Sequence, residues 1–120
     1  MRILFYSLCC LMGLAVWAAE ESLLEHAAAE SSGLRNPLRD DEQARRAGAK
    51  LYQRECAACH GADREGRRRV PALAREDVYA VPPGGLFWIL RNGSLWRGMP
   101  SFAHLPEAQR WQIVTFLQSK

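Results

Sequence analysis

Two cysteines and a histidine occur together in the pentad Cys56-Ala57-Ala58-Cys59-His60. The two intervening residues bring both sulfurs to one side of a single turn, and a histidine directly after the second cysteine lies on that side as well. Thiols at this spacing can add to the two vinyl groups of a haem, while the adjacent imidazole binds the iron. The pentad therefore predicts one haem c, attached covalently through Cys56 and Cys59, with His60 as an iron ligand.

A Cys-x-x-Cys pair also occurs in zinc sites and in dithiol redox couples. A structural zinc ion normally needs a second pair of ligands, and a redox dithiol is expected in a thioredoxin-like βαβ unit. Neither is visible in this sequence, because the other two cysteines, Cys9 and Cys10, lie in the apolar N-terminal segment. The histidine after the second cysteine favours haem attachment over both alternatives.

Residues 1–18 have the composition of a secretory signal peptide. Arg2 precedes an apolar run from Ile3 to Val16, and small residues surround a cleavage point after Ala18. The alternative is an uncleaved membrane anchor, since the run reaches the short end of what spans a bilayer. Cleavage would leave only the two cysteines of the pentad, with no spare thiol for a disulfide. We expect a periplasmic or otherwise exported protein.

The remaining chain has room for one small globular domain, since the whole sequence has 120 residues, of which 48% are apolar. We expect an acidic flexible arm over 19–39, acting as a tether or a wrapping arm, in which residues 22–30 could form a short helix. The haem domain follows over 40–120. Its expected helices run from Asp41 to about Glu55, from Leu86 to about Leu90, and from Pro106 to about Gln118. Residues 82–85 look like a break and 96–100 like a loop.

No strand pattern of useful length appears, so the predicted fold class is all-α. In the first long helix, Ala44, Gly48, Leu51 and Tyr52 form one stripe. A glycine inside a helix costs ~1 kcal/mol relative to alanine. A close crossing with another helix would explain Gly48, and a merely tolerated glycine is the alternative.

A haem iron bound by His60 has a second axial position, for which the mature chain offers Met99, His104 and His26. Met99 lies between Gly98, which lets the backbone approach closely, and Pro100, which stiffens the exit. The alternative is that Met99 only fills space in the hydrophobic core, as a lone methionine often does. We predict Met99 as the ligand, with His104 as the next candidate and His26 in the solvated arm.

Four stretches of the sequence can be taken together: Gly48-x-x-Leu51-Tyr52-x-x-x-Cys56-x-x-Cys59-His60-Gly61, Pro71-x-Leu73, Gly98-Met99-Pro100 and Trp111-x-Ile113-Val114-x-Phe116-Leu117. These motifs resemble the small class I mono-haem cytochromes c of bacteria over about residues 44–119. The resemblance implies three to five helices around one haem, His/Met coordination by His60 and Met99, and electron carriage. It also implies that the Pro71 carbonyl accepts a hydrogen bond from Nδ1 of His60. The alternative is that Pro71 only interrupts regular structure in the loop.

Charge is unevenly distributed along the chain. Residues 19–42 carry seven acidic and two basic side chains, whereas residues 43–120 carry thirteen basic and six acidic ones. Three arginines at 67–69 occupy a loop that is often rich in glycine in the family. A basic haem domain suggests docking to an acidic partner surface. The alternative is that these arginines form an ordinary solvated surface or neutralise the haem propionates.

The resulting functional prediction is a single-electron carrier, not an enzyme, between exported redox partners such as a dehydrogenase and a terminal oxidase. One alternative is a dedicated haem subunit of a periplasmic dehydrogenase complex. Another is haem-based catalysis or ligand sensing, which requires that Met99 does not bind the iron. We expect a monomer that binds no nucleic acid and meets a membrane only if the leader is uncleaved.

Overall fold

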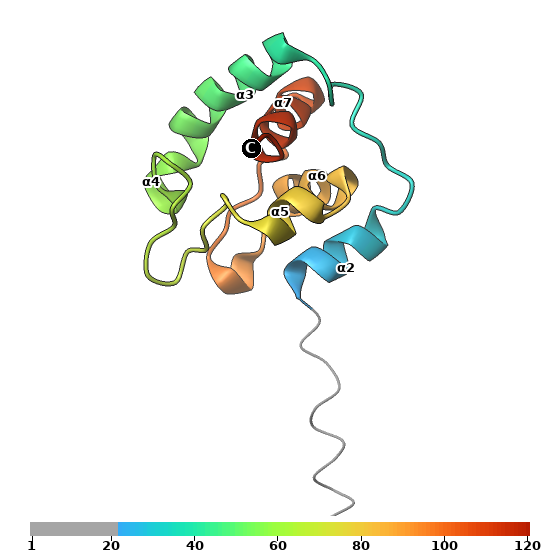
Figure 1. Cartoon of the computed structure of the whole chain (residues 1–120). Helices are drawn as coiled ribbons and strands as arrows, with labels where there is room; N and C mark the ends of the chain where they lie inside the picture. Colours follow the sequence, from blue (N-terminus) through green and yellow to red (C-terminus); the bar gives the residue numbers. More distant parts are fainter. Residues whose placement is uncertain (1–21) are drawn as a thin grey trace, which may run out of the picture.

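The computed structural model describes residues 22–120. The expected signal peptide and residues 19–21 of the expected arm lie outside this range. Six α-helices and one 3₁₀ turn follow one another in the described residues (Figure 1): α2 (Leu23–Glu30), α3 (Glu42–Glu55), α4 (Ala57–His60), α5 (Glu76–Ala80), α6 (Pro83–Asn92), η1 (Leu95–Arg97) and α7 (Glu107–Leu117).

The all-α class is confirmed, since residues 22–120 contain two isolated β-bridges and no strand. Two of the six helices, α4 and α5, are single turns of four and five residues, which is why the described part exceeds the three to five helices expected. Within residues 22–120, no helix is long and apolar enough to cross a membrane.

The helix α3 begins where the sequence predicts. The side chain of Asp41 accepts a hydrogen bond from the Ala44 backbone nitrogen at 3.0 Å, which satisfies one of the free N–H groups of the first turn. The helix α7 follows Pro106, whose fixed φ suits a helix start. These two helices are the ones that carry the predicted apolar stripes.

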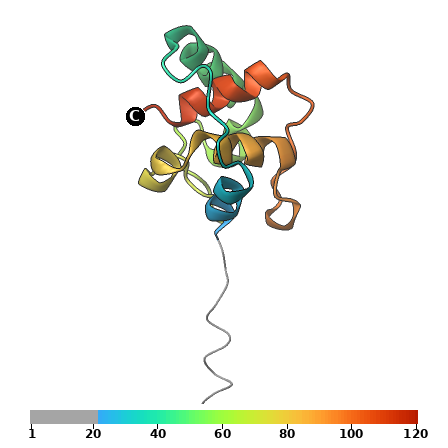
Figure 2. The same ribbon diagram turned by 90° about the vertical axis from the view of Figure 1, so that its right-hand side faces the viewer.

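The crossing of α3 and α7 forms the centre of the fold, and both views show the two helices side by side (Figures 1 and 2). Gly48 lies at the contact: a Cβ added there would be 1.9 Å from the Gln112 carbonyl oxygen and 2.9 Å from the Phe116 Cβ. Tyr52 packs one turn further along, with its ring centroid 5.4 Å from that of Phe116. The expected close crossing at Gly48 is confirmed.

The helix α6 packs under α7 and completes the hydrophobic core. The rings of Phe87 and Trp111 stack with their centroids 4.0 Å apart. Tyr52, Ile113 and Val114 are completely buried. The core therefore joins α3, α6 and α7. It holds in place α3, which precedes the pentad, and α6, which precedes the loop that contains Met99.

The helix α2 lies along α6, with which it is side by side in Figure 1. Ser22 caps it through a reciprocal pair of hydrogen bonds with Glu25. Its Ala27 is buried, and residues 28–34 approach α6 so closely that a Cβ at Gly84 would be 2.9 Å from the Leu34 Cβ. Over residues 22–39 the expected arm thus contains a helix and lies against the domain. The boundary at residue 40 stays a prediction.

Two local expectations were wrong. Residues 82–85 were expected to break regular structure, but α6 begins at Pro83, because proline is well suited to the first turn and the two glycines admit the approach of the 28–34 segment. Residues 96–100 were expected to form a loop, but residues 96–97 belong to the 3₁₀ turn Leu95–Arg97, which ends at Gly98 in the left-handed conformation (φ +78°).

Candidate functional site

The pentad forms a tight turn at the end of α3. The backbone nitrogen of Cys56 donates to the Tyr52 carbonyl at 2.8 Å, which continues the hydrogen bonding of α3. The Cys56 carbonyl then accepts from the nitrogens of Cys59 and His60, at 3.1 and 2.9 Å. The chain therefore winds through one further turn, α4, with Cys56 at its start and Cys59 and His60 within it.

The two cysteines are free thiols with different surroundings. Cys56 is buried in the core, and Cys59 is exposed. Burial, followed by the nearby Glu55 and Cys59, raises the pKa of Cys56 to about 12. The thiol of Cys56 is therefore protonated at neutral pH and faces apolar side chains, which suits it to contact an apolar group rather than to bind a zinc ion as a thiolate.

The ring of His60 is oriented by one hydrogen bond. Its Nδ1 lies 2.8 Å from the carbonyl oxygen of Pro71. A carbonyl can only accept, so Nδ1 carries a proton, and in the neutral form of the ring Nε2 keeps its lone pair. Nε2 is thus available to bind a metal. This is the contact that the resemblance implied for His60 and Pro71.

The loop between His60 and Pro71 is fastened to the core helices at two points. The Tyr52 hydroxyl donates to the Gly61 carbonyl at 2.6 Å, just after the histidine. The Arg64 guanidinium reaches the end of α7 and donates to the Ser119 carbonyl at 3.1 Å, with longer contacts to the carbonyls of Phe116 and Leu117. These contacts hold the histidine loop against α3 and α7.

Sequence reasoning missed the roles of Tyr52 and Arg64. The position of Tyr52, one turn before Cys56, was a signal that its side chain could reach the pentad. Arg64 gave no such signal, because its partners are more than fifty residues away and its backbone adopts φ +62°, a region that arginine rarely occupies.

Met99 lies in a separate, tightly closed loop. The Ser94 nitrogen donates to the Met99 carbonyl at 2.9 Å, and the Met99 nitrogen donates back to the Ser94 carbonyl at 3.0 Å. The Met99 side chain is half-buried and packs against the hydrophobic core. The loop therefore fixes the backbone of Met99 while its side chain contacts the core.

The other two candidate ligands are placed differently. His104 is exposed, with its ring 6.0 Å from that of Phe102. His26 is exposed on α2, and its ring lies nearly perpendicular to that of Trp88, with the ring centroids 5.3 Å apart. Neither packs into the core cluster as Met99 does.

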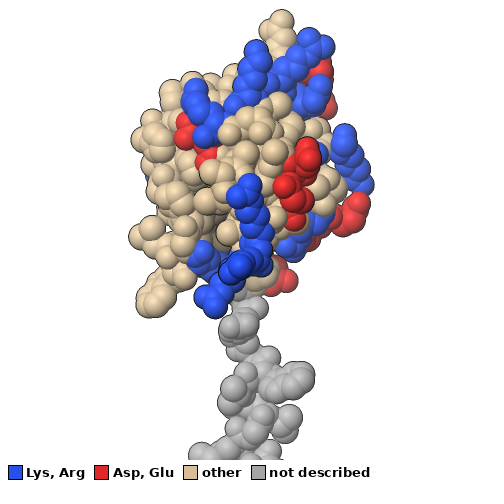
Figure 3. All heavy atoms as spheres, turned by 90° about the vertical axis from the view of Figure 1, so that its left-hand side faces the viewer, with Lys and Arg blue, Asp and Glu red and all other residues tan. Residues whose placement is uncertain are grey.

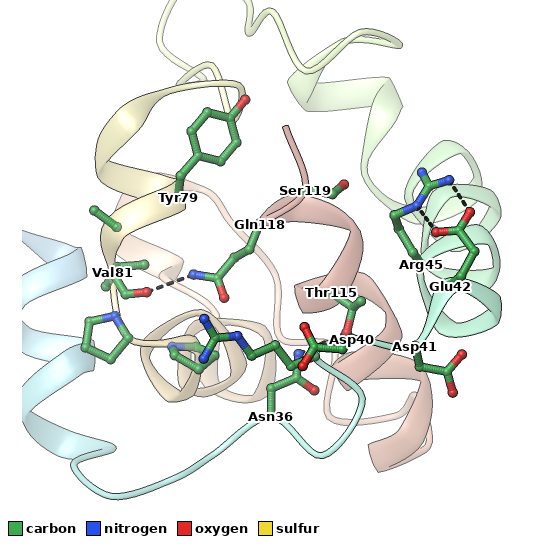
Figure 4. A pocket seen from close by; sticks show the side chains of 14 residues that line it. Asn36, Asp40, Asp41, Glu42, Arg45, Tyr79, Val81, Thr115, Gln118 and Ser119 are labelled. Carbon is green, nitrogen blue, oxygen red and sulfur yellow. Dashed lines mark hydrogen bonds and ion pairs between the residues drawn. The ribbon is translucent and has the colours of Figure 1, made fainter.

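A polar cavity of about 470 Å³ lies where the segment before α3 meets the ends of α5 and α7 (Figure 4). Gln118 spans part of it by donating to the Val81 carbonyl at 2.8 Å. Its lining includes no residue of the pentad and not Met99. Within residues 22–120, no three His, Cys, Asp or Glu side chains gather as they would around a zinc ion. The candidate chemistry therefore stays with the pentad.

The comparison with protein families agrees with this site. The family model described as cytochrome c oxidase, cbb3-type, subunit III matches residues 43–117, from the start of α3 to the end of α7. The chain belongs to this family of c-type cytochromes. In the comparison with curated proteins, no relative matches the chain.

Among solved structures, the cytochrome is similar to cytochrome CL from the marine methylotrophic bacterium Methylophaga aminisulfidivorans MPT. The TM-score is 0.59 and the identity is 22%, over 84% of this chain and 67% of that one. At this identity the likeness shows the fold, which is that of a small class I cytochrome c.

The family implies a haem c, and the residues present fit one. The cytochrome offers two unpaired cysteines on one turn, one of them against the core, and a histidine whose Nδ1 is bonded to the Pro71 carbonyl, so that Nε2 is the nitrogen left for a metal. Cys56 and Cys59 would attach the haem and His60 would bind its iron. Haem-based electron transfer is the activity that this family membership supports.

The face that carries α3 and α4 bears more basic than acidic side chains (Figure 3). Arg67, Arg68 and Arg69 are all exposed in the loop after the pentad. None of the three makes an ion pair with another described residue. Their charges are thus available to a partner or to the haem propionates.

Proposed function

We propose that this cytochrome is a single-electron carrier, not an enzyme, with one haem c attached through Cys56 and Cys59 and ligated by His60 and Met99. The observation that carries the proposal is the hydrogen bond from His60 Nδ1 to the Pro71 carbonyl, which leaves Nε2 to bind iron in a fixed orientation. A bound haem supplies a ferric/ferrous couple that exchanges one electron. Pro71 would also increase the electron density on the imidazole through this bond.

Met99 has the properties of the second axial ligand. Its half-buried thioether packs against the core, and its backbone is held by the paired hydrogen bonds with Ser94. A thioether is a soft, neutral ligand that favours ferrous over ferric iron and so raises the reduction potential. Bound to the iron, the Met99 sulfur would also exclude oxygen and peroxide, as expected for an electron carrier but not for a haem enzyme or a ligand sensor.

The partners would be exported redox proteins, one donor and one acceptor, at least one of which presents an acidic docking surface. The basic side chains over 43–120 favour such a surface, since opposite charge raises the encounter rate. We place the protein in the periplasm or another exported compartment and infer that it is a monomer. It meets no nucleic acid, and it meets a membrane only if the leader over 1–18 is retained.

A second candidate function is a dedicated haem subunit of a larger enzyme complex. The family description, which names a subunit of an oxidase, favours it. The docked α2 segment, outside the matched range 43–117, could contribute to such an assembly. Isolation of the protein from its source under mild conditions distinguishes the two: a carrier elutes alone, whereas a subunit elutes with the enzyme.

Haem attachment is tested by replacing both cysteines of the pentad. We expect C56S/C59S to lose covalent haem completely, because both thioethers need a sulfur atom. Denaturing electrophoresis with haem staining measures this, and the single variants should retain a weaker band. A double variant that still stains contradicts the proposed attachment.

The role of Met99 is tested by Met99→Ala. We expect a lower reduction potential and rapid binding of carbon monoxide by the reduced protein, whereas the reduced wild type should bind it poorly. A redox titration and a carbon monoxide difference spectrum measure the two effects. His104→Ala is the matched control and should alter neither. If Met99→Ala behaves as wild type and His104→Ala does not, His104 is the ligand.

A further inference from the structure

Two large apolar side chains project into solvent immediately before Met99. Trp96 is 101% exposed and Leu95 is 80% exposed, whereas Leu34, the other exposed large hydrophobic residue among the described ones, is only 45% exposed. Single exposed apolar residues are common on proteins, but two adjacent ones of this size at a loop tip indicate an interaction site. Tryptophan is also among the residues most often dominant in binding interfaces.

Backbone hydrogen bonds hold the tip in a closed turn. The paired bonds between Ser94 and Met99 close the loop, and within it the Arg97 nitrogen donates to Ser94 and the Gly98 nitrogen to Leu95, at 2.9 and 3.0 Å. In Figure 2 this segment, drawn in orange, projects from the body of the molecule. A tip that is ordered before it binds loses little conformational entropy on binding.

The charged residues nearest to the tip in the sequence are all basic. Arg91 and Arg97 are exposed and make no ion pair with another described residue. The sequence has no acidic residue between Asp77 and Glu107. An apolar tip flanked along the chain by two exposed basic side chains fits a partner surface with an apolar pocket and an acidic rim.

A protein partner fits this tip better than a lipid surface. Segments that bind anionic membranes carry clusters of about four to eight basic residues, and this tip has two. Moreover, the tip and Met99 share one six-residue loop, so that a partner on the tip would contact the loop of the proposed iron ligand. A redox partner gains from that position, because electron exchange requires close approach, whereas a lipid surface would block it.

We propose that Leu95 and Trp96 insert into an apolar, acid-rimmed pocket on the redox protein with which this cytochrome exchanges electrons. The inference rests on the proposed carrier function and adds the surface that recognises the partner. Leu95 and Trp96 anchor the complex, while Arg91 and Arg97 pair with the rim.

The test compares the holoprotein with the double variant L95S/W96S and with L34S, which removes an exposed leucine from another part of the surface. Reduced and oxidised proteins are mixed with membrane and soluble extracts of the organism of origin, and the second-order rate of electron exchange is followed at the haem band. We expect the rate of L95S/W96S to fall at least tenfold with one extract, with the reduction potential unchanged, and the rate of L34S to match wild type.

An unchanged rate for L95S/W96S overturns the docking proposal. So does a wild type that exchanges electrons with neither extract. If wild type co-sediments with vesicles of phosphatidylglycerol and phosphatidylcholine and L95S/W96S does not, the tip binds lipid and not a redox protein. If wild type forms a dimer that the two substitutions dissociate, the tip binds a second copy of this chain. Failure of the carrier function itself is distinguished by the redox titration, since a haem without a reversible one-electron couple overturns both proposals.

Discussion

The substitution Gly48→Ala tests the helix crossing on which the fold depends. The added Cβ would lie 1.9 Å from the Gln112 carbonyl oxygen and 2.6 Å from its carbonyl carbon, and both are backbone atoms that cannot rotate away. Ordinary contact needs about 3.4 Å, so α3 and α7 must separate by roughly 1.5 Å. Overpacking of this kind costs ~1–3 kcal/mol, and backbone contact favours the upper end.

Alanine also favours the helix itself by ~1 kcal/mol relative to glycine. The expected net loss in the free energy of unfolding is therefore about 2 kcal/mol, which corresponds to a fall in Tm of roughly 8–16 °C for a domain of this size. Far-UV circular dichroism of the holoprotein during thermal and urea unfolding measures it.

The matched control is the exposed residue Lys50 on the same helix. Lys50→Ala should be more stable than Lys50→Gly by ~1 kcal/mol, because only helix propensity differs there. If Gly48→Ala is as stable as wild type, or more so, the helices do not cross as closely as the Gly48 contact requires.

Three further predictions concern the surface. Arg64→Gln should lower the free energy of unfolding by about 1 kcal/mol, because the carbonyls at the end of α7 lose a cationic donor. Urea unfolding measures this. Arg67 makes no such contact, so Arg67→Gln should leave the free energy of unfolding unchanged. Hydrogen bonds from Arg45 and then Arg46 lower the pKa of Glu42 from 4.5 to about 2, so the ionised form is favoured in the folded state. The contribution of the ionised Glu42 to the free energy of unfolding is complete above pH 4.5 and is lost as the pH falls toward 2. The difference in stability between wild type and Glu42→Gln should therefore shrink over that range and be constant above it. A difference that stays constant at every pH contradicts the ion pairs. If the three arginines at 67–69 dock a partner, replacing all of them by glutamine should slow electron transfer at low salt and flatten its dependence on salt concentration. If they neutralise the haem propionates, the same change should shift the reduction potential and leave the rate of electron transfer unchanged.

The parts of the fold that could be predicted are those specified by local chemistry. Asp41 as a helix cap, Pro106 before the last helix and the glycine in the α3 stripe each have a local physical reason, and each is found as expected. The placement of the pentad at the end of α3 follows from the same helix prediction.

The features that could not be predicted depend on distant parts of the chain. Gly84 and Gly85 look like helix breakers until residues 28–34 are seen to need their small size. Arg64 looks like one more loop arginine until its guanidinium meets the end of α7. The exposure of Trp96 depends on the closure of its loop by Ser94 and Met99.

The central claim, that His60 and Met99 together hold the iron of an electron-carrying haem, is tested most directly by the near-infrared spectrum of the oxidised wild-type protein. The claim predicts the weak charge-transfer band that marks thioether coordination of ferric haem, and predicts its loss in Met99→Ala. A wild-type spectrum without that band, unaltered by Met99→Ala, would contradict it and would leave Met99 as a loop residue beside an iron free for other ligands.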